Sequence, residues 1–160
     1  GGAGGCGNKV LLVGTSESGK KWLLRSLFGE LDLQGCADAR VRHCPWFQGV
    51  ATGCVASSVS SADVDFYLLN PDELTAKHRN SLRKTAALRQ FDGLVLVHKA
   101  ESEESFETLS DFLASFPEVQ DPALAQVVAM CVCNGVSSGA VKEDGDVLQW
   151  CTENHLEVFH

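Results

Sequence analysis

The sequence predicts an α/β protein whose strands form one doubly wound, mostly parallel sheet. Short apolar runs alternate with longer stretches whose apolar residues recur at helical spacing. At one place, early in the chain, two strand-like runs follow each other with no helix between them, which predicts one antiparallel edge. The 160 residues, of which 44% are hydrophobic, are enough for the core of a single domain.

The chain is expected to open with a flexible leader and a first strand-helix unit. Residues 1–8 are rich in glycine and precede a domain predicted over residues 9–160. Residues 9–13, KVLLV, form a mostly apolar run of the kind found in strands covered on both faces. A helix follows a glycine-bearing turn and is predicted to end near Gly29. Its apolar face combines Leu23, Leu24, Leu27, Phe28 and Leu31.

The next part of the chain contains the two consecutive strands. The first is predicted over residues 40–47, near an edge of the sheet because it contains Pro45. Residues 48–62 are small and polar, so we expect a loop there, with at most a short strand around residues 54–55. Residues 63–69 form the next strand, and Asp72 is expected to cap a helix that runs to about residue 89.

The remaining elements alternate regularly. We expect strands at 93–97, 127–133 and 156–159, a helix that opens at Ser102 and ends before Pro117, and a helix over 143–155. The resulting order, β-α-β-β-α-β-α-β-α-β, is that of a small G-domain with a six-stranded sheet. The last helix that such domains usually carry is not among the predicted elements, so we expect either that the natural protein is longer or that this helix has been lost.

A phosphate-loop pattern lies between the first strand and the first helix. Residues 14–21 read GTSESGKK, and the template is G-x-x-x-x-G-K-[ST] in this context. Gly14, Ser18, Gly19 and Lys20 are the residues expected to cradle a phosphate group, with Lys20 reaching its terminal oxygens. A turn from strand to helix needs glycine even when it binds nothing, so the loop can also persist as scaffold.

The metal-binding parts of the G-domain pattern are damaged. Lys21 stands where a Ser or Thr hydroxyl would ligate Mg²⁺, and an ammonium group repels a cation. The third strand runs into residues 69–72, LNPD, which lack a D-x-x-G motif, and only Asn134 remains of the guanine-reading N-K-x-D. The sequence therefore predicts no enzyme and no required cofactor. Weak GTP or GDP binding stays open, with Lys21 and Asn134 as further contacts, and Mg²⁺ binding is disfavoured.

Composition excludes several partner classes. The net charge is −8, and no basic stripe interleaved with aromatic residues is present, so nucleic acid is not an expected partner. No apolar run approaches the roughly 20 residues of a membrane span. The seven cysteines form no CxxC pair and match no common zinc spacing, so no metal site is predicted. We expect mostly buried, reduced thiols and a cytosolic protein.

Several short motifs resemble the alpha- and gamma-adaptin-binding protein family. They are CPW at residues 44–46, SADVD at 61–65, FPEV at 116–119, QWC at 149–151 and HLEV at 155–158. Their order and approximate spacing agree with that family over residues 9–160. The resemblance implies a Rab-like pseudo-GTPase domain that binds subunits of the clathrin adaptor complexes and assists their assembly in vesicle trafficking. The phosphate loop is better preserved here than that role requires.

Exposed aromatic and basic residues are the expected partner contacts. Trp22 lies off the apolar stripe of its helix, and Trp46 lies in a strand where it either packs on the sheet or anchors a partner. Arg79, Arg83 and Lys84 give one helix a basic face that suits an acidic partner, although such a face is often simply solvated. The main alternative function is a divergent small GTPase that acts as a nucleotide-dependent switch in membrane traffic. An ATP- or phosphate-binding P-loop protein is a weaker one.

Overall fold

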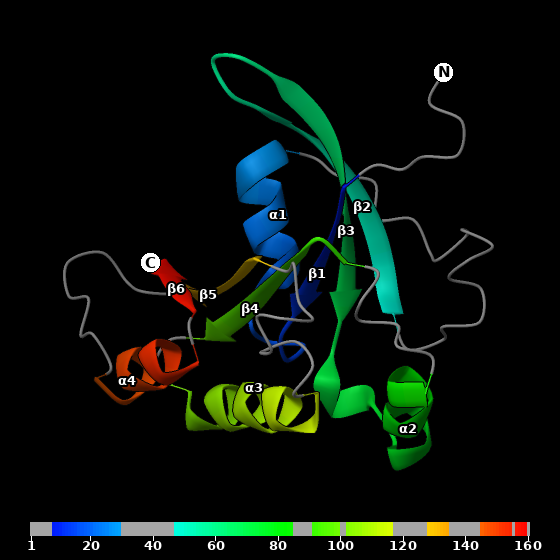
Figure 1. Ribbon diagram of the computed structural model, residues 1–160, viewed down its shortest axis with the longest axis vertical. Helices are drawn as coiled ribbons and strands as arrows, with labels where there is room; N and C mark the ends of the chain where they lie inside the picture. Colours follow the sequence, from blue (N-terminus) through cyan, green and yellow to red (C-terminus); the bar gives the residue numbers. More distant parts are fainter. Residues whose placement is uncertain are drawn as a thin grey trace.

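The computed structural model is an α/β fold with helices on both faces of a mixed sheet (Figure 1). It describes residues 8–29, 47–84, 91–99, 102–116, 128–134, 145–154 and 156–159. The strands are β1 (Asn8–Val13), β2 (Phe47–Ala56), β3 (Ser61–Leu69), β4 (Gly93–Lys99), β5 (Val128–Asn134) and β6 (Glu157–Phe159). The helices are α1 (Lys20–Phe28), α2 (Ala76–Lys84), α3 (Glu103–Ser115) and α4 (Gly145–Glu153), and a short 3₁₀ turn, η1, spans Pro71–Glu73. The predicted α/β class is confirmed.

The strands are ordered β2-β3-β1-β4-β5-β6 across the sheet. All neighbours run parallel except β2 and β3, which form an antiparallel hairpin at one edge. The predicted antiparallel edge is therefore confirmed. Because β1, β3, β4 and β5 are parallel, their carboxyl ends share one edge of the sheet, where ligand sites of open α/β sheets lie.

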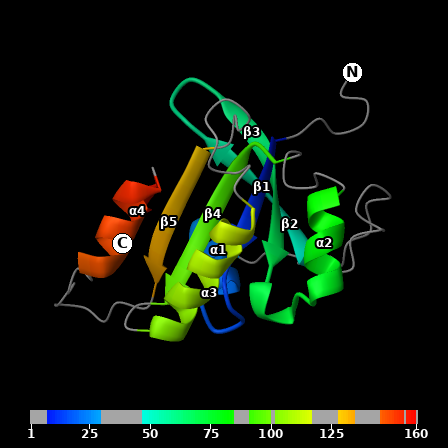
Figure 2. The ribbon, with the colours of Figure 1, turned by 60° about the horizontal axis from the view of Figure 1, so that its bottom comes forward.

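Alternation along the central strands divides the core into two layers. In β1, Leu11 and Val13 belong to a cluster that includes residues of α2, α3 and α4, whereas Leu12 joins a smaller cluster with Leu24 of α1. Successive side chains of a strand point to opposite faces, so both faces of β1 are covered. Figures 1 and 2 show α1 on one side of the sheet and α3 on the other.

The prediction for the β2–β3 hairpin was wrong. Residues 48–62 were expected to be a loop, but β2 extends to Ala56 and β3 begins at Ser61. Glycine, alanine and serine give this stretch little intrinsic preference for strand, and pairing with the apolar β3 decides its conformation. Ala51 is fully buried in the sheet, and a Cβ at Gly53 would lie 2.9 Å from the Phe28 ring, so small residues are required there. The predicted strand over 40–46 lies outside the described residues.

The start of α2 also differs from the prediction. Asp72 does not cap α2 but lies in η1, where its N–H donates to Asn70 Oδ1 at 3.0 Å. The helix begins at Ala76, and Thr75 Oγ1 accepts a bond from His78 N–H at 3.2 Å. Thr75 is therefore the residue that caps α2. The predicted end of this helix, after residue 84, lies outside the described residues.

Two predicted helix boundaries are confirmed. Gly29 follows α1 with a φ of 78°, a conformation that favours glycine, and its N–H donates to Arg25 O at 2.8 Å. Ser102 caps α3, whose buried face includes Leu109 and Phe112. Leu27 of α1 differs from its prediction, because it is 64% exposed although it was placed on the apolar face.

Candidate functional site

The glycine-rich loop lies at the carboxyl end of β1, between the ends of β3 and β4. Gly14 N–H donates to Leu69 O at 3.2 Å, which ties the start of the loop to the end of β3. A Cβ at Gly14 would lie 2.4 Å from Ser18 Oγ and 2.7 Å from Val97 O. The second contact is to backbone of β4 and cannot move aside easily. Glycine is therefore required at this position by close packing of three segments.

The end of the loop depends on a left-handed residue. Gly19 has φ 84° and ψ 26°, a conformation that costs other residues free energy. It precedes the first residue of α1, and Leu23 N–H donates to Gly19 O at 2.9 Å. Glycine is therefore needed at position 14 because no side chain fits there, and at position 19 because the backbone is left-handed.

The carbonyl of Thr15 gathers three donors inside the loop. Ser18 N–H and Ser18 Oγ donate to it at 3.0 Å and 2.7 Å, and Lys20 Nζ donates to it at 2.9 Å. Thr15, Ser18 and Lys20 are all buried. The loop is consequently closed by its own hydrogen bonds, and three of its side chains are withdrawn from solvent.

Lys20 folds back onto the loop that precedes it. Its ammonium group donates to Gly14 O as well as to Thr15 O, and the residue is only 4% exposed. Burial lowers the pKa of Lys20 to about 8, because a charge is costly away from water; the nearby carboxylates of Asp72 and Glu73 offset part of this shift, and Lys21 adds to it. Two of its three N–H donors are used within the loop, which leaves one for an external anion.

Lys21 does not join this buried network. It is the second residue of α1 and is exposed to solvent. It occupies the position where the phosphate-loop template has a hydroxyl. The side chain supplies positive charge near the mouth of the loop and offers no oxygen to a cation.

Asn70 is a buried polar residue at the end of β3 to which the sequence analysis gave no role. It is 2% exposed, and its Oδ1 accepts from Asp72 N–H at 3.0 Å. Its amide therefore shapes η1 beside the loop. The signal available in the sequence was its place directly after a buried strand and before Pro71, where Asn commonly supports a turn.

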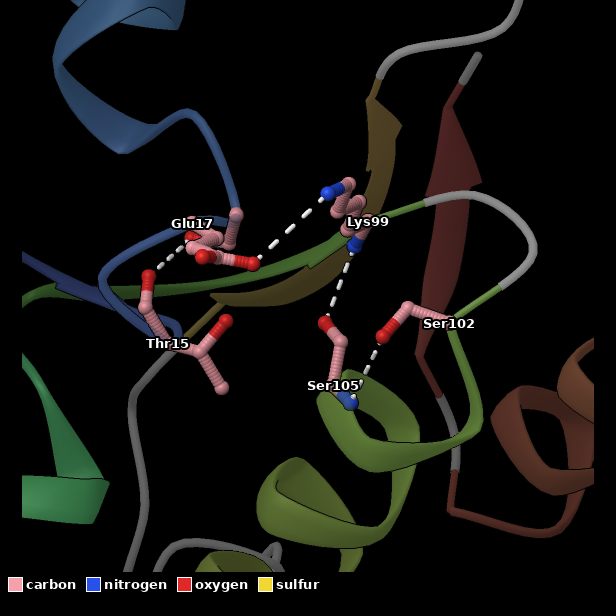
Figure 3. A network of polar contacts seen from close by, with 6 residues as sticks. Thr15, Glu17, Lys99, Ser102 and Ser105 are labelled. Carbon is pink, nitrogen blue, oxygen red and sulfur yellow. Dashed lines mark hydrogen bonds and ion pairs between the residues drawn. The ribbon is translucent and has the colours of Figure 1, made fainter.

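A polar chain joins the loop to α3 (Figure 3). Lys99 Nζ, at the end of β4, lies 3.8 Å from Glu17 Oε2, and both side chains are exposed. Lys99 N–H donates to Ser105 Oγ at 2.9 Å, and Ser105 N–H donates to Ser102 Oγ at 3.2 Å. The buried hydroxyl of Ser105 thus fixes the β4–α3 connection, while the exposed ion pair adds little stability.

The remaining predicted nucleotide contact, Asn134, is the last residue of β5. Its backbone lies in register with Lys99, so β5 ends at the same edge as the loop. The glycine-rich loop follows β1, and Asn134 ends β5; β4 lies between these two parallel strands. This position agrees with a shared site at the carboxyl edge, and a nucleotide-binding role of these residues stays a prediction.

The predicted partner contacts differ in their surroundings. Trp22 is 61% exposed on α1, and Lys84 is exposed at the end of α2. Arg79 instead donates to Ser115 Oγ at 3.3 Å and to Pro71 O at 3.4 Å.

Arg83 is also engaged within the chain. Its Nε–H donates to Ser115 O at 2.9 Å, and its guanidinium lies 5.7 Å from the centre of the Phe116 ring. Both arginines therefore connect α2 to the end of α3. Trp46 lies outside the described residues.

Within the described ranges, no cluster of three or more His, Cys, Asp or Glu side chains could hold a metal ion. No helix in these ranges has both the length and the apolar composition needed to cross a bilayer. Neither a protein-family model nor any curated protein matches the sequence.

Proposed function

We propose that this chain is a small G-domain-like pseudo-GTPase that binds subunits of clathrin adaptor complexes and assists their assembly. The observation that carries the pseudo-GTPase part of this proposal is that Lys20 donates hydrogen bonds to Gly14 O and Thr15 O. In a working phosphate loop this lysine would bind a phosphate group, whereas here it bonds to the carbonyls of the loop itself. The neighbouring Lys21 provides no hydroxyl for Mg²⁺.

The end of β3 supports the same conclusion. A metal-dependent GTPase places a carboxylate near this point to hold the metal shell. This chain has the neutral amide of Asn70, which is buried and accepts from Asp72 N–H. Lys21 thus replaces the expected hydroxyl, and Asn70 replaces the carboxylate at the end of β3; the nearest carboxylates, of Asp72 and Glu73, belong to η1 and lie near Lys20. Such a domain keeps the scaffold and loses the means to stabilise the charge that develops in phosphoryl transfer.

The adaptor half of the proposal rests on the motifs that resemble the adaptin-binding family. The described ones lie in or beside ordered elements: SADVD at the start of β3, and QWC within α4. Trp22 and Lys84 are the predicted partner contacts that the structure leaves exposed. Tryptophan is a favoured anchor at interfaces, and the charge of Lys84 suits an acidic partner. We propose that the protein acts in the cytosol.

Binding to purified adaptor subunits is the direct test. The wild-type chain is expected to retain one or more large or small adaptor subunits in a pull-down. Trp22→Ala and Lys84→Glu are expected to weaken retention without loss of the folded state, since both side chains are exposed. Ser58→Ala, at the exposed hairpin tip, is the matched control. Absence of binding to every subunit would remove the adaptor proposal.

A nucleotide-dependent switch is the second candidate. The conformation of Gly19 and the close approach at Gly14 keep the loop in a form that could receive one phosphate group. Calorimetry with GTP, with and without Mg²⁺, separates the two functions. We expect no dependence on Mg²⁺. Tight, Mg²⁺-dependent binding that Lys20→Ala abolishes would favour the switch.

A further inference from the structure

The outer edge of β2 has no strand beside it in the part of the chain that the structure describes. Among the described strands, β2 pairs only with β3, so none of them bonds to the backbone groups on its other side. Its ten residues, FQGVATGCVA, contain no charge and no proline. Lysine, proline and inward charges are the devices by which proteins protect such edges. Here the described edge has only a register shift between Phe47 and Gly49.

The hairpin turn fixes which backbone groups face outward. Ser57 N–H donates to Ser60 O at 2.7 Å and closes the turn. Hydrogen-bonded and non-hydrogen-bonded pairs alternate along an antiparallel ladder. Counting from this closing pair, residues 51, 53 and 55 direct their N–H and C=O groups to β3. Residues 50, 52, 54 and 56 direct theirs to the open side.

Side chains along this edge leave room for another strand. Thr52, Cys54 and Ala56 are small and exposed, and they share one face of the hairpin. The opposite face carries Gly49, Ala51 and Gly53. Phe28 covers Gly53 on that second face, and Val55 is the large exposed side chain of β2 there. The small side chains of Thr52, Cys54 and Ala56 leave the first face open to an extended segment at the ordinary spacing of a sheet.

The charged residues of the β2–β3 hairpin itself are both acidic. Residues 47–69 contain two charged residues, Asp63 and Asp65. They pair across the ladder with Cys54 and Thr52, and Thr52 Oγ1 donates to Asp65 Oδ1 at 2.6 Å. Both aspartates lie on the face of the small exposed side chains. Lys9 is the register neighbour of Asp65 on β1, whereas Asp63 lies one place beyond the start of β1.

We propose that β2 accepts an extended segment of a protein partner that carries lysine or arginine at alternate positions. Main-chain bonds to residues 50, 52, 54 and 56 would give affinity, as in other cases of strand addition. Strands lie about 4.8 Å apart, so a side chain on the added strand starts about 10 Å from the aspartates. A long cationic side chain can cross Thr52 and Cys54 to reach them. A second copy would bring two more aspartates instead of cations.

A defined peptide tests this surface without any assumption about adaptors. The probe is a short, end-blocked peptide of alternating lysine and valine, and the readout is amide hydrogen exchange along β2. Exchange at residues 50, 52, 54 and 56 is expected to slow about tenfold at saturation, while residues 51, 53 and 55 change little. A peptide with glutamate in place of lysine is expected to protect these amides far less.

Two pairs of variants sharpen the test. Thr52→Pro removes an outward N–H without removing a main-chain bond to β3, and it is expected to abolish protection. Thr52→Val keeps that N–H and is the matched control. If Thr52→Pro does not fold, the double change Asp63→Asn and Asp65→Asn replaces it, and binding of the lysine peptide should then weaken severalfold. Equal binding of the lysine and glutamate peptides, or no protection at all, would overturn the proposal.

The natural partner is expected among the adaptor subunits, and this step rests on the proposed function. Slowed exchange at the same outward amides in an adaptor complex would extend the proposal to that partner. If adaptors bind without protecting β2, the function stands and the assignment of adaptors to this edge fails. If the peptide binds while no adaptor does, the edge proposal stands and the function fails. If the chain forms a dimer whose outward β2 amides are protected without peptide, the edge proposal is overturned, because a second copy then occupies the edge.

Discussion

Lys20 is buried as a cation, and this burial gives the stability of the chain a pH dependence. Its pKa in the folded state is about 8, below the value of 10.5 for an exposed lysine. Between these values the unfolded chain binds more protons than the folded chain, so the free energy of unfolding rises with pH. The contribution of Lys20 should grow by roughly 3 kcal/mol at most from pH 7 to pH 10.5.

Urea unfolding of wild type and Lys20→Met across this pH range measures that contribution. Every other residue is the same in the two proteins, so the difference between them isolates Lys20. Wild type is expected to gain stability relative to Lys20→Met as pH rises. A difference that stays constant with pH would show that the ammonium keeps its charge in the folded state at an ordinary pKa.

Gly14 makes a second prediction at the residue scale. A methyl group there would meet Ser18 Oγ and the carbonyl of Val97. Gly14→Ala should therefore destabilise the fold by about 1–3 kcal/mol, as overpacking does elsewhere. Thermal unfolding of the single and double variants separates the two contacts. Adding Ser18→Ala should not restore stability, because the Val97 carbonyl belongs to the backbone of β4; full rescue would contradict this account.

At the scale of secondary structure, α3 shows what local sequence can specify. Ser102 and Pro117 bracket the helix in the sequence, and its apolar residues recur at helical spacing. The hairpin shows the opposite case. Gly49, Ala51 and Gly53 carry no strand signal, and their conformation follows from packing under Phe28 and pairing with β3. Contacts distant in sequence decide such elements, so a single sequence does not reveal them.

The contribution of the Ser102 cap to the free energy of unfolding is expected to be measurable. Ser102→Ala removes the acceptor of Ser105 N–H and should lower the free energy of unfolding by about 1 kcal/mol. Ser102→Thr keeps an oxygen in that place and serves as the control, with a much smaller loss. Chemical denaturation of both variants decides the point. An equal loss in both would assign the effect to packing and not to capping.

The α2–α3 connection predicts that two neighbouring basic residues behave differently. Arg83 bonds to Ser115 O and lies over the Phe116 ring, whereas Lys84 is exposed. Arg83→Ala should destabilise the fold by about 1 kcal/mol or somewhat more. Lys84→Ala should change stability by less than about 0.5 kcal/mol. Thermal unfolding compares them, and equal small effects would show that the Arg83 contacts contribute little.

At the scale of the whole molecule, the sequence predicted where the glycine-rich loop lies but not which hydrogen bonds form inside it. The spacing of Gly14 and Gly19 and the apolar strand before them placed the loop at the carboxyl edge of the sheet. That Lys20 would turn back to the loop carbonyls depends on which donors and acceptors meet in three dimensions. The role of Asn70 depends equally on η1, which a strand-to-helix pattern does not reveal.

Amide hydrogen exchange of the protein without any ligand should be slowest in the middle of the sheet and faster along β2 at its edge. Amides of β1 and β4 in the middle of the sheet, such as those of Leu12 and Leu96, lie between two apolar layers and should exchange most slowly. Along β2, protection should alternate, with Ala51 and Gly53 slow and Thr52 and Cys54 fast, because only the first pair bonds to β3. Residue-resolved exchange by NMR tests this pattern. Uniform protection along β2 would mean that its outer edge is already paired, and inverted alternation would mean that the hairpin register differs by one residue, which would move every side chain of β2 to the other face of the sheet.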